Sequence, residues 1–495
     1  SYGGAGTLQM TMRPGLTSLA VTGNAALAGP LVVNLTPRVV LAEDQFTPIT
    51  YGSKTGTFSN IVSPAALSFA PTYNANNVTL TASLVPFANS AATRNQGSIG
   101  SALETLRANP TGDAATVLGN LYTLDALRLR SALDQIGPIA FATMRGLDMA
   151  ASGAHASAVG QRMTAIADGS SQKTRVAAYT VSKPAPYPGI LLAYAGNDLS
   201  SLDLAPADGG GRSRWGFFTS GLVTTGRLTE ANSASGSQPG YTFNTGGLTA
   251  GADYRLDDHF AVGASAGYLR GHAGVYAPSA GTVDSSSARF GVYGTGFGEN
   301  FRASLFVGGA ADFYKTRRDI VFNGITRTAG ASPHGTEFNT SIGASYDVKT
   351  NAWGTFSPFA GLNYDRIMID RFTETGADSL DLTVYEQTSQ SLQSSLGLRF
   401  SDSFSGESYM WKPYVSAGWR RQFSNQIRPI DAVLANAGGE KFSVTTGDYA
   451  RNGALLGTGF LLILSKQTSV KLDYTGDFRS HYQVNTVNAH LRFKF

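Results

Sequence analysis

The sequence contains no cysteine, few charged residues and no long apolar run. None of its 495 residues is cysteine and only 15% are charged. A chain without cysteine has no disulfide framework, which is compatible with passage through an oxidising compartment. The longest apolar candidate, residues 455–464, is far shorter than the ~20 residues that a transmembrane helix needs. Any membrane role must therefore use a β-barrel, and the dispersed net charge of +4 does not indicate nucleic-acid binding.

A secretion leader is also missing from the start of the chain. Ser1 is followed by YGGAGTL, which has neither a basic start nor an apolar core. We expect that processing or truncation removed an upstream segment and that this chain is the tail of a longer protein.

The final segment, TVNAHLRFKF, alternates between apolar and polar residues. Val487, Ala489, Leu491, Phe493 and Phe495 share one parity, and the polar residues occupy the other. Side chains alternate across a strand, so this strand has one apolar and one polar face. In a membrane barrel the apolar face would contact lipid and the polar face the lumen. An edge strand of a soluble sheet is the alternative.

The same alternation recurs from residue 214 to the end, for example in 301–316, 392–400, 414–420 and 470–478. We count about twelve strands, many long enough to cross a bilayer when tilted. Short connections such as LDDH and GEN alternate with longer ones such as TEANSASGSQPG and RPIDAVLANAGGE. Outer-membrane barrels have short periplasmic turns and longer outer loops. The medium-length SDSFSGESYM and the short FRSHYQ are exceptions. This segment therefore predicts a twelve-strand antiparallel transmembrane β-barrel over residues 214–495.

All four tryptophans lie in this predicted barrel. Trp215, Trp353 and Trp411 open strands that, in this interpretation, run outward from the periplasm. We expect these three to form an aromatic girdle at the periplasmic rim. An even number of strands also returns Phe495 to the periplasmic side.

Three segments precede the barrel. Residues 1–88 hold short β-prone runs separated by Gly, Pro and Asn, which predicts the end of a β-solenoid or a small sandwich. Residues 89–168 are rich in Ala, Leu, Arg and Gln at helical spacing, which predicts a small helical unit packed on the β segment or on itself. Residues 169–213, with Pro184, Pro186 and Pro188, predict a linker.

No residue set in the sequence predicts catalysis, a cofactor or a metal site. The six histidines lack metal-ligand spacing, and no GxSxG nucleophile motif is present. We expect the histidines to be solvated loop, turn or lumen residues. We also expect the pair Arg317-Arg318 to be solvated at a turn or rim. The sequence predicts no enzyme activity for this chain.

The order of the segments resembles the C-terminal part of a monomeric (type Va) autotransporter. LAVTGNAALAGPLVVNL and NNVTLTASL resemble the last rungs of a β-helical passenger, and ATRNQGSIGSALETL and LDQIGPIAFATM resemble the helical region before the translocator. Residues 214–495 resemble the twelve-strand translocator barrel, which closes on the terminal aromatic strand. The three linker prolines depart from the plain helix that the family implies for the pore.

The resemblance implies a type V secretion translocator in the bacterial outer membrane. It implies insertion among outer-membrane lipids with help from periplasmic chaperones and the barrel-assembly machinery. The N-terminal passenger would cross to the cell surface, and the barrel would anchor it. Leu491, Phe493 and Phe495 match the family's C-terminal assembly signal, and the linker 169–213 would thread the lumen. One chain supplies all the strands, so we expect a monomer.

Two other functions fit the same pattern. The first is a porin-like outer-membrane channel with a periplasmic N-terminal domain. The second is a surface adhesin that binds through residues 1–168. The side of the membrane on which residues 1–168 lie separates the channel from the other two functions.

Overall fold

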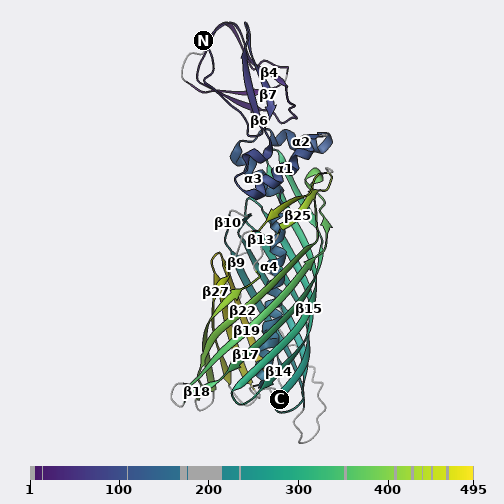
Figure 1. The fold of residues 1–495 in the computed structure, drawn as a ribbon, viewed down its shortest axis with the longest axis vertical. Coiled ribbons are helices and arrows are strands. Elements are labelled where there is room, and N and C mark those ends of the chain that lie inside the picture. The colour runs from purple at the N-terminus through teal and green to yellow at the C-terminus, as the bar shows by residue number, and fades with distance from the viewer. Residues whose placement is uncertain are drawn as a thin grey trace.

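The computed structural model describes most of the chain. The described residues are 6–13, 15–108, 110–167, 175–176, 214–233, 236–350, 354–405, 410–424, 429–436, 439–446, 450–463 and 468–493. A small β unit, a group of helices and a long β-barrel follow one another along the longest axis of the molecule (Figure 1). The predicted linker lies outside the described residues, apart from β8 (Arg175–Val176), which pairs with the last barrel strand.

Seven strands are described in the N-terminal unit. They are β1 (Leu8–Met12), β2 (Leu19–Leu27), β3 (Pro30–Leu35), β4 (Gln45–Gly56), β5 (Asn60–Val62), β6 (Leu67–Tyr73) and β7 (Asn77–Leu84). β1, β3 and β5 pair in parallel, and β2 pairs in parallel with β4. Antiparallel β6 and β7 then complete the second sheet. Parallel pairing of successive short strands is compatible with the end of a solenoid, and that assignment stays a prediction.

Four α-helices follow, at the positions where the sequence predicts helical segments. They are α1 (Arg94–Ala108), α2 (Gly112–Leu121), α3 (Ala126–Ile136) and α4 (Ala142–Ala167), with 3₁₀ turns η1 (Phe87–Ser90) and η2 (Pro138–Phe141). The side chain of Asp125 caps α3 by accepting a 2.9 Å hydrogen bond from the Arg128 N–H. Gly137 and Pro138 end α3, as predicted. None of the helices in the described ranges combines the length and hydropathy of a membrane span.

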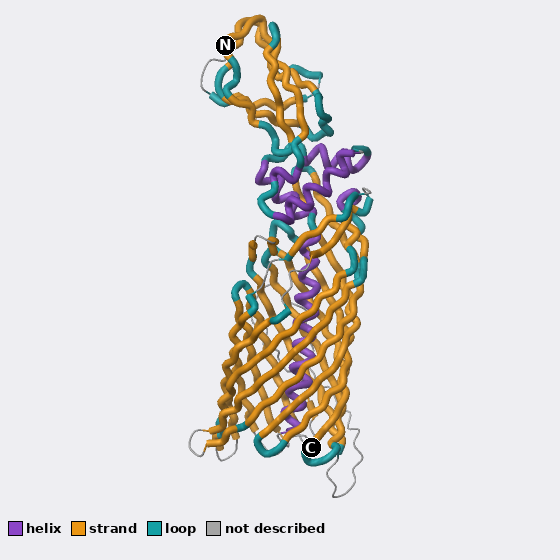
Figure 2. The backbone as a smooth tube through the Cα atoms, in the orientation of Figure 1, coloured by secondary structure: helices purple, strands orange, loops and turns teal. Residues whose placement is uncertain are grey.

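The barrel has twelve antiparallel strands that form one closed sheet (Figures 1 and 2). They are β9 (Trp215–Leu228), β12 (Tyr241–Arg255), β13 (Phe260–Val275), β14 (Gly281–Phe297), β15 (Phe301–Phe322), β17 (His334–Tyr346), β19 (Gly354–Ile369), β22 (Gln387–Ser401), β24 (Met410–Gln422), β27 (Asn452–Ile463), β28 (Thr468–Arg479) and β29 (Tyr482–Phe493). Each strand pairs with its sequence neighbour in the barrel, and β29 closes the ring on β9. The predicted fold class is therefore confirmed.

The two ends of the barrel differ. At one end, here called the turn end, β9 begins and short connections such as 256–259 and 298–300 join the strands. The opposite end, here called the cap end, carries helices α1–α3 (Figure 2). The connection at FRSHYQ lies at the cap end, where the other connections are mostly longer. It is short, as the sequence indicates, because only two residues separate β28 from β29.

The cap end carries several additional short elements. They are β10 (Ala231–Ser233), β11 (Gly236–Gln238), β16 (Ile325–Ala331), β20 (Phe372–Thr373), η3 (Asp378–Leu380), β21 (Leu382–Val384), β25 (Pro429–Leu434) and β26 (Phe442–Thr445). β20, β21, β25 and β26 form a small antiparallel sheet, here called the loop sheet. Among the described elements, the turn end carries the short strands β8, β18 (Val348–Thr350) and β23 (Phe404–Ser405).

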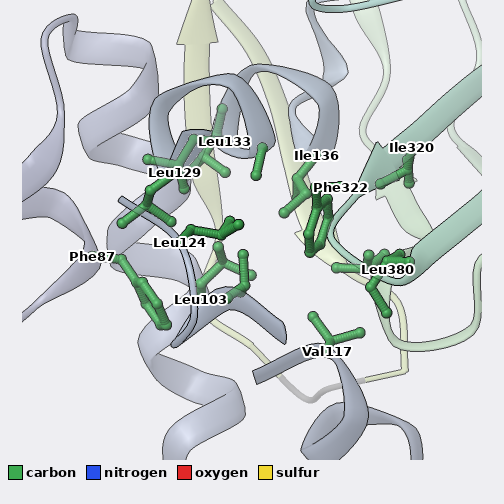
Figure 3. Close-up of a cluster of buried hydrophobic side chains, with 14 of the residues drawn as sticks. Phe87, Leu103, Val117, Leu124, Leu129, Leu133, Ile136, Ile320, Phe322 and Leu380 are labelled. Atoms are coloured by element: carbon green, nitrogen blue, oxygen red, sulfur yellow. The ribbon is translucent and has the colours of Figure 1, made fainter. Parts of the chain in front are cut away.

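One apolar core joins the helices to the barrel loops. Leu103, Val117, Leu129 and Leu133 from α1–α3 are fully buried. Figure 3 shows them around Ile320 and Phe322 of β15 and Leu380 of η3, which are buried in the same cluster. Helices α1–α3, here called the cap, therefore dock on the barrel through a continuous hydrophobic core.

Candidate functional site: the barrel lumen and its cap

Helix α4 does not pack on the cap but runs through the inside of the barrel (Figure 2). The prediction that the whole helical unit packs on the β segment or on itself is therefore wrong for α4. The helix contacts β9, β12, β13, β14 and β15, and touches β17 and β19. Its 26 residues span about 39 Å, which exceeds the hydrocarbon thickness of a membrane.

A polar stripe along α4 meets polar side chains of the lumen wall. Asp148 accepts a 2.6 Å hydrogen bond from the Tyr314 hydroxyl. Ser152 donates to Asp365 at 2.7 Å and accepts from Asn339 at 2.8 Å. These contacts join the cap-end half of the helix to β15, β17 and β19.

His155 lies further along the same stripe. Its ring nitrogens lie 3.1 Å from the Thr249 hydroxyl and 3.2 Å from the Ser265 hydroxyl. The side chain is buried, at 1% exposure. The expectation of a solvated histidine is wrong here, because the lumen wall surrounds the ring on the side of β12 and β13.

Arg162 makes a two-point contact near the turn end. Its guanidinium donates to both carboxylate oxygens of Asp253, at 2.6 and 3.0 Å, and both side chains are buried. The Tyr293 hydroxyl donates to the same carboxylate at 3.1 Å. A two-point pair with an extra hydrogen bond fixes both the position and the rotation of the helix.

Glycines of the barrel leave room for these side chains. A Cβ atom at Gly216 would lie 2.1 Å from Nη2 of Arg162, and one at Gly267 would lie 2.8 Å from Nδ1 of His155. Any larger residue at Gly216 would collide with the Arg162–Asp253 pair. Glycines in the wall thus leave the space that the side chains of α4 occupy.

The helix lies off-centre and leaves a cavity on its other side. The cavity has a volume of about 300 Å³. It is lined by Met149, Gly153 and Ser157 of α4 and by wall residues that include Asn363, Gln393 and Arg420. The lumen is therefore occupied on one side and hollow on the other.

Arg318 is the central polar contact between the cap and the barrel. The expectation of a solvated Arg317-Arg318 pair is wrong for Arg318, whose side chain is only 1% exposed. Its guanidinium pairs with Glu374, which is equally buried, and donates to the Gln135 and Ile136 carbonyls at 3.0 and 2.9 Å. Those carbonyls end α3, where orphan acceptors and the helix dipole favour a cation.

Asp113 makes a second polar contact between the cap and the barrel loops. It accepts hydrogen bonds from the Arg327 guanidinium and from the hydroxyl and N–H of Ser379. Burial alone would raise the pKa of Asp113, but the hydrogen bonds from Arg327 and Ser379 outweigh burial and lower it to about 2. The carboxylate is therefore charged at any pH above about 3.

The outer face of the barrel is apolar where the inner face is polar. Large apolar side chains on this face are between 43% and 58% exposed, namely Phe217, Val262, Phe290, Leu305, Ile342, Leu398, Val415 and Leu456. Such a continuous exposed belt marks a membrane-facing surface.

Two of the predicted girdle residues are described. Trp215 opens β9 and is 58% exposed, and its ring lies 5.0 Å from that of Tyr254. Trp411 is the second residue of β24, is 41% exposed and packs against Phe404. Trp353 lies outside the described residues. The girdle role stays a prediction.

The predicted assembly signal lies at the end of β29. Leu491 and Phe493 pair through their backbones with Val470 and Thr468 of β28. Their side chains and the whole of Phe495 lie outside the described residues. Their role in assembly stays a prediction.

The fold and the lumen define a class, that of outer-membrane β-barrels with a chain segment inside the pore. The Autotransporter beta-domain family matches residues 217–475, more than half of the chain. The chain therefore belongs to that family, and its barrel is a type V secretion translocator of the outer membrane.

Curated relatives are similar over about half of this chain. An extracellular serine protease of Serratia marcescens is 25% identical over 267 residues, which is 53% of this chain and 25% of that protein. The esterase EstA of Pseudomonas aeruginosa is 24% identical over 256 residues, which is 50% of this chain and 37% of that protein. The matched part thus spans well under half of either relative.

Solved structures with a similar barrel include two autotransporters. The translocator domain of NalP from Neisseria meningitidis has a TM-score of 0.45 at 16% identity and covers 70% of this chain and 98% of that one. The transport unit of AIDA-I from Escherichia coli has a TM-score of 0.40 at 16% identity and covers 60% of this chain and 93% of that one.

Proposed function

We propose that the chain is the C-terminal part of a monomeric (type Va) autotransporter and that residues 1–88 end a passenger at the cell surface. The path of the chain carries the proposal. The N-terminal unit and the cap lie beyond the cap end, α4 runs down the lumen, and β9 begins at the turn end (Figure 1). A chain with this path has residues 1–141 on one side of the barrel and the start of β9 on the other.

This path supports secretion through the barrel. In the family the short turns face the periplasm, so the cap end would face outward. The barrel would insert with help from periplasmic chaperones and the barrel-assembly machinery, with Leu491, Phe493 and Phe495 as the assembly signal. The linker 169–213 would connect the end of α4 to the start of β9.

The cap and α4 would then keep the passenger attached. The apolar core around Phe322 and the buried Arg318–Glu374 pair hold the cap on the loops. The Arg162–Asp253 pair holds the helix in the pore. A helix fixed in this way favours a translocator after secretion over an open porin-like channel.

The chain itself is proposed not to be an enzyme. The relatives are named for serine protease and esterase activities, but the matches cover only 25% and 37% of their lengths. The family match falls on the barrel.

Surface proteolysis of intact cells tests this proposal. An epitope tag inserted at Gly324, in the β15–β16 turn, reports the cap end, and a tag at Glu299, in the β14–β15 turn, reports the turn end. We expect external protease to remove the cap and the Gly324 tag and to leave a barrel fragment that retains the Glu299 tag. A Gly324 tag that is cut only after the outer membrane is opened would place the cap in the periplasm and favour the channel.

The adhesin alternative has its own test. Cells that carry the chain without residues 1–168 should lose binding to neighbouring cells if these residues are the adhesive part. Unchanged binding leaves secretion and anchoring as the function of the chain.

A further inference from the structure

A repeated pattern of side chains marks the outer face of the barrel near the cap end. In four strands that run toward the cap, an outward aromatic residue is followed two positions later by a cation. Residues two apart lie on the same face of a strand. The pairs are Tyr268 and Arg270 in β13, Phe313 and Lys315 in β15, Tyr364 and Arg366 in β19, and Trp419 and Arg421 in β24.

These four cations, together with Arg227 of β9, are here called the basic ring. All five are exposed. Arg270 donates to the Tyr268 hydroxyl at 3.3 Å, and Arg421 lies 5.8 Å from the Phe423 ring centre. Among the interactions of the described residues, none of the five makes an ion pair with a carboxylate. Their charge is therefore available to an external anion.

Neighbouring charges do not neutralise the basic ring. Asp284 lies opposite Lys315 in the ladder, but it is held by His272 at 2.7 Å. Arg317, two residues beyond Lys315, is paired with Asp319 at 3.0 Å. The turn end carries charges of both signs, since exposed Asp257, Asp258 and Glu299 lie in its short turns and exposed Arg214 and Lys412 lie at the starts of its strands. The basic ring is thus a set of cations without a carboxylate partner among the described residues, at the cap side of the apolar belt.

We propose that the basic ring binds the phosphate groups of an anionic glycolipid whose acyl chains lie along the apolar belt. Arginine presents a planar fork of donors that matches phosphate oxygens, and a lysine adds a point charge. Aromatic side chains at the edge of the belt hold the level of the headgroups. The assignment to the outer leaflet rests on the proposed function, which places the cap outside the cell.

Lipid competition on the purified, full-length protein tests the ring. Folded protein in neutral detergent is mixed with lipid A that carries both phosphates and with the same lipid without phosphates, and bound lipid is counted by native mass spectrometry. We expect the wild type to retain the phosphorylated lipid preferentially. The triple variant R270Q/R366Q/R421Q should bind it on the order of 100-fold more weakly, because each cation near an anionic headgroup is worth about a fivefold change in affinity.

A matched variant separates the ring from total charge. R13Q/R94Q/R128Q removes three exposed cations from the N-terminal unit and the cap, far from the belt, and should bind like the wild type. Each variant is first checked for the heat-dependent gel shift of a folded barrel. If the triple variant does not fold, the single variants R270Q and R366Q replace it, each with about a fivefold loss.

Several outcomes would overturn the proposal. They are equal retention of the two lipids by the wild type, an unchanged preference in the triple variant, or displacement of the lipid by an equal concentration of inorganic phosphate. A failure of the orientation alone is distinguishable. Surface proteolysis would then place the cap in the periplasm, and the preference for phosphate in detergent would persist.

Discussion

Arg318→Met is the substitution that most directly tests how the cap is held on the barrel. The methionine keeps an apolar stem in the core but removes the guanidinium that pairs with Glu374. It also removes the donors to the Gln135 and Ile136 carbonyls at the end of α3. Glu374 would be left buried, with only the Leu382 N–H as a hydrogen-bond donor among the described contacts.

The expected magnitude follows from burial. Breaking a buried ion pair by removal of one partner costs about 3–5 kcal/mol, because the other charge stays in a low-dielectric site. Every 1.4 kcal/mol is a tenfold change in an equilibrium. Undocking of the cap should therefore become roughly 100 to 4,000 times more frequent. The printed side-chain hydrogen bonds of Arg318 go to Glu374 and to the Gln135, Ile136 and Leu380 carbonyls, which lie outside the twelve-strand ladder, so the ladder should keep its stability.

Hydrogen exchange on the purified protein measures this effect. We expect faster exchange in α1–α3 and the loop sheet, and unchanged exchange in β22, β24 and α4. The control is Arg317→Met, at the preceding residue of the same strand. The Arg317 side chain is 61% exposed, so its loss should change hydrogen exchange in the cap little. The double variant R318M/E374Q should recover part of the loss, since the unpaired charge is gone. Unchanged cap exchange in R318M would refute the docking argument.

Three further predictions concern the lumen, the cap and the last strand. Arg162→Met should loosen α4, since Asp253 loses its two-point partner, and should raise single-channel conductance in a planar bilayer. Lowering the pH from 5 to 2 should reduce cap protection by about 1 kcal/mol in the wild type but not in Asp113→Asn. The folded pKa of Asp113, about 2, lies below its unfolded value, so its contribution is present above about 3.8 and is lost as the pH falls through 2. Phe495→Asp should lower the amount of barrel in the outer membrane, measured by fractionation, because it puts a charge at the end of the closing apolar strand.

Each of these predictions has an outcome that contradicts it. Conductance in R162M equal to that of the wild type would mean that other contacts alone hold the helix. Parallel pH profiles of the wild type and D113N would remove the carboxylate from the docking energy. Normal outer-membrane levels of F495D, with correct heat-dependent gel shift, would separate the last residue from assembly.

The barrel was predictable because its signal is local and repeated. In β15 the outward Phe301, Leu305 and Phe313 alternate with inward residues, and the sequence shows the same alternation of apolar and polar residues. The helix limits were predictable for a similar reason, since Asp125 caps α3 and Pro138 follows its end. Both features depend only on residues a few positions apart.

The position of α4 and the docking of the cap depend on contacts across hundreds of residues. A signal for the lumen was nevertheless present, because Asp148, Ser152, His155 and Arg162 are spaced by four, three and seven residues, on one face of a helix otherwise rich in Ala and Gly. Arg318 gave no such signal. Nothing in its neighbourhood distinguishes it from the exposed Arg317 until α3 and Glu374 are placed around it.

The contacts of α4 allow it one position in the lumen. A shift by one helical turn, about 5.4 Å, would separate Arg162 from Asp253 and His155 from Thr249 at the same time. It would also move the Arg162 guanidinium out of the space that Gly216 leaves open. The cap cannot follow such a shift into the pore, because Leu129 and Leu133 are held in the core with Phe322 outside the lumen. The polar stripe of α4 fits the lumen wall, and the apolar core of the cap fits the barrel loops. Together these two sets of contacts fix how far the chain extends through the barrel.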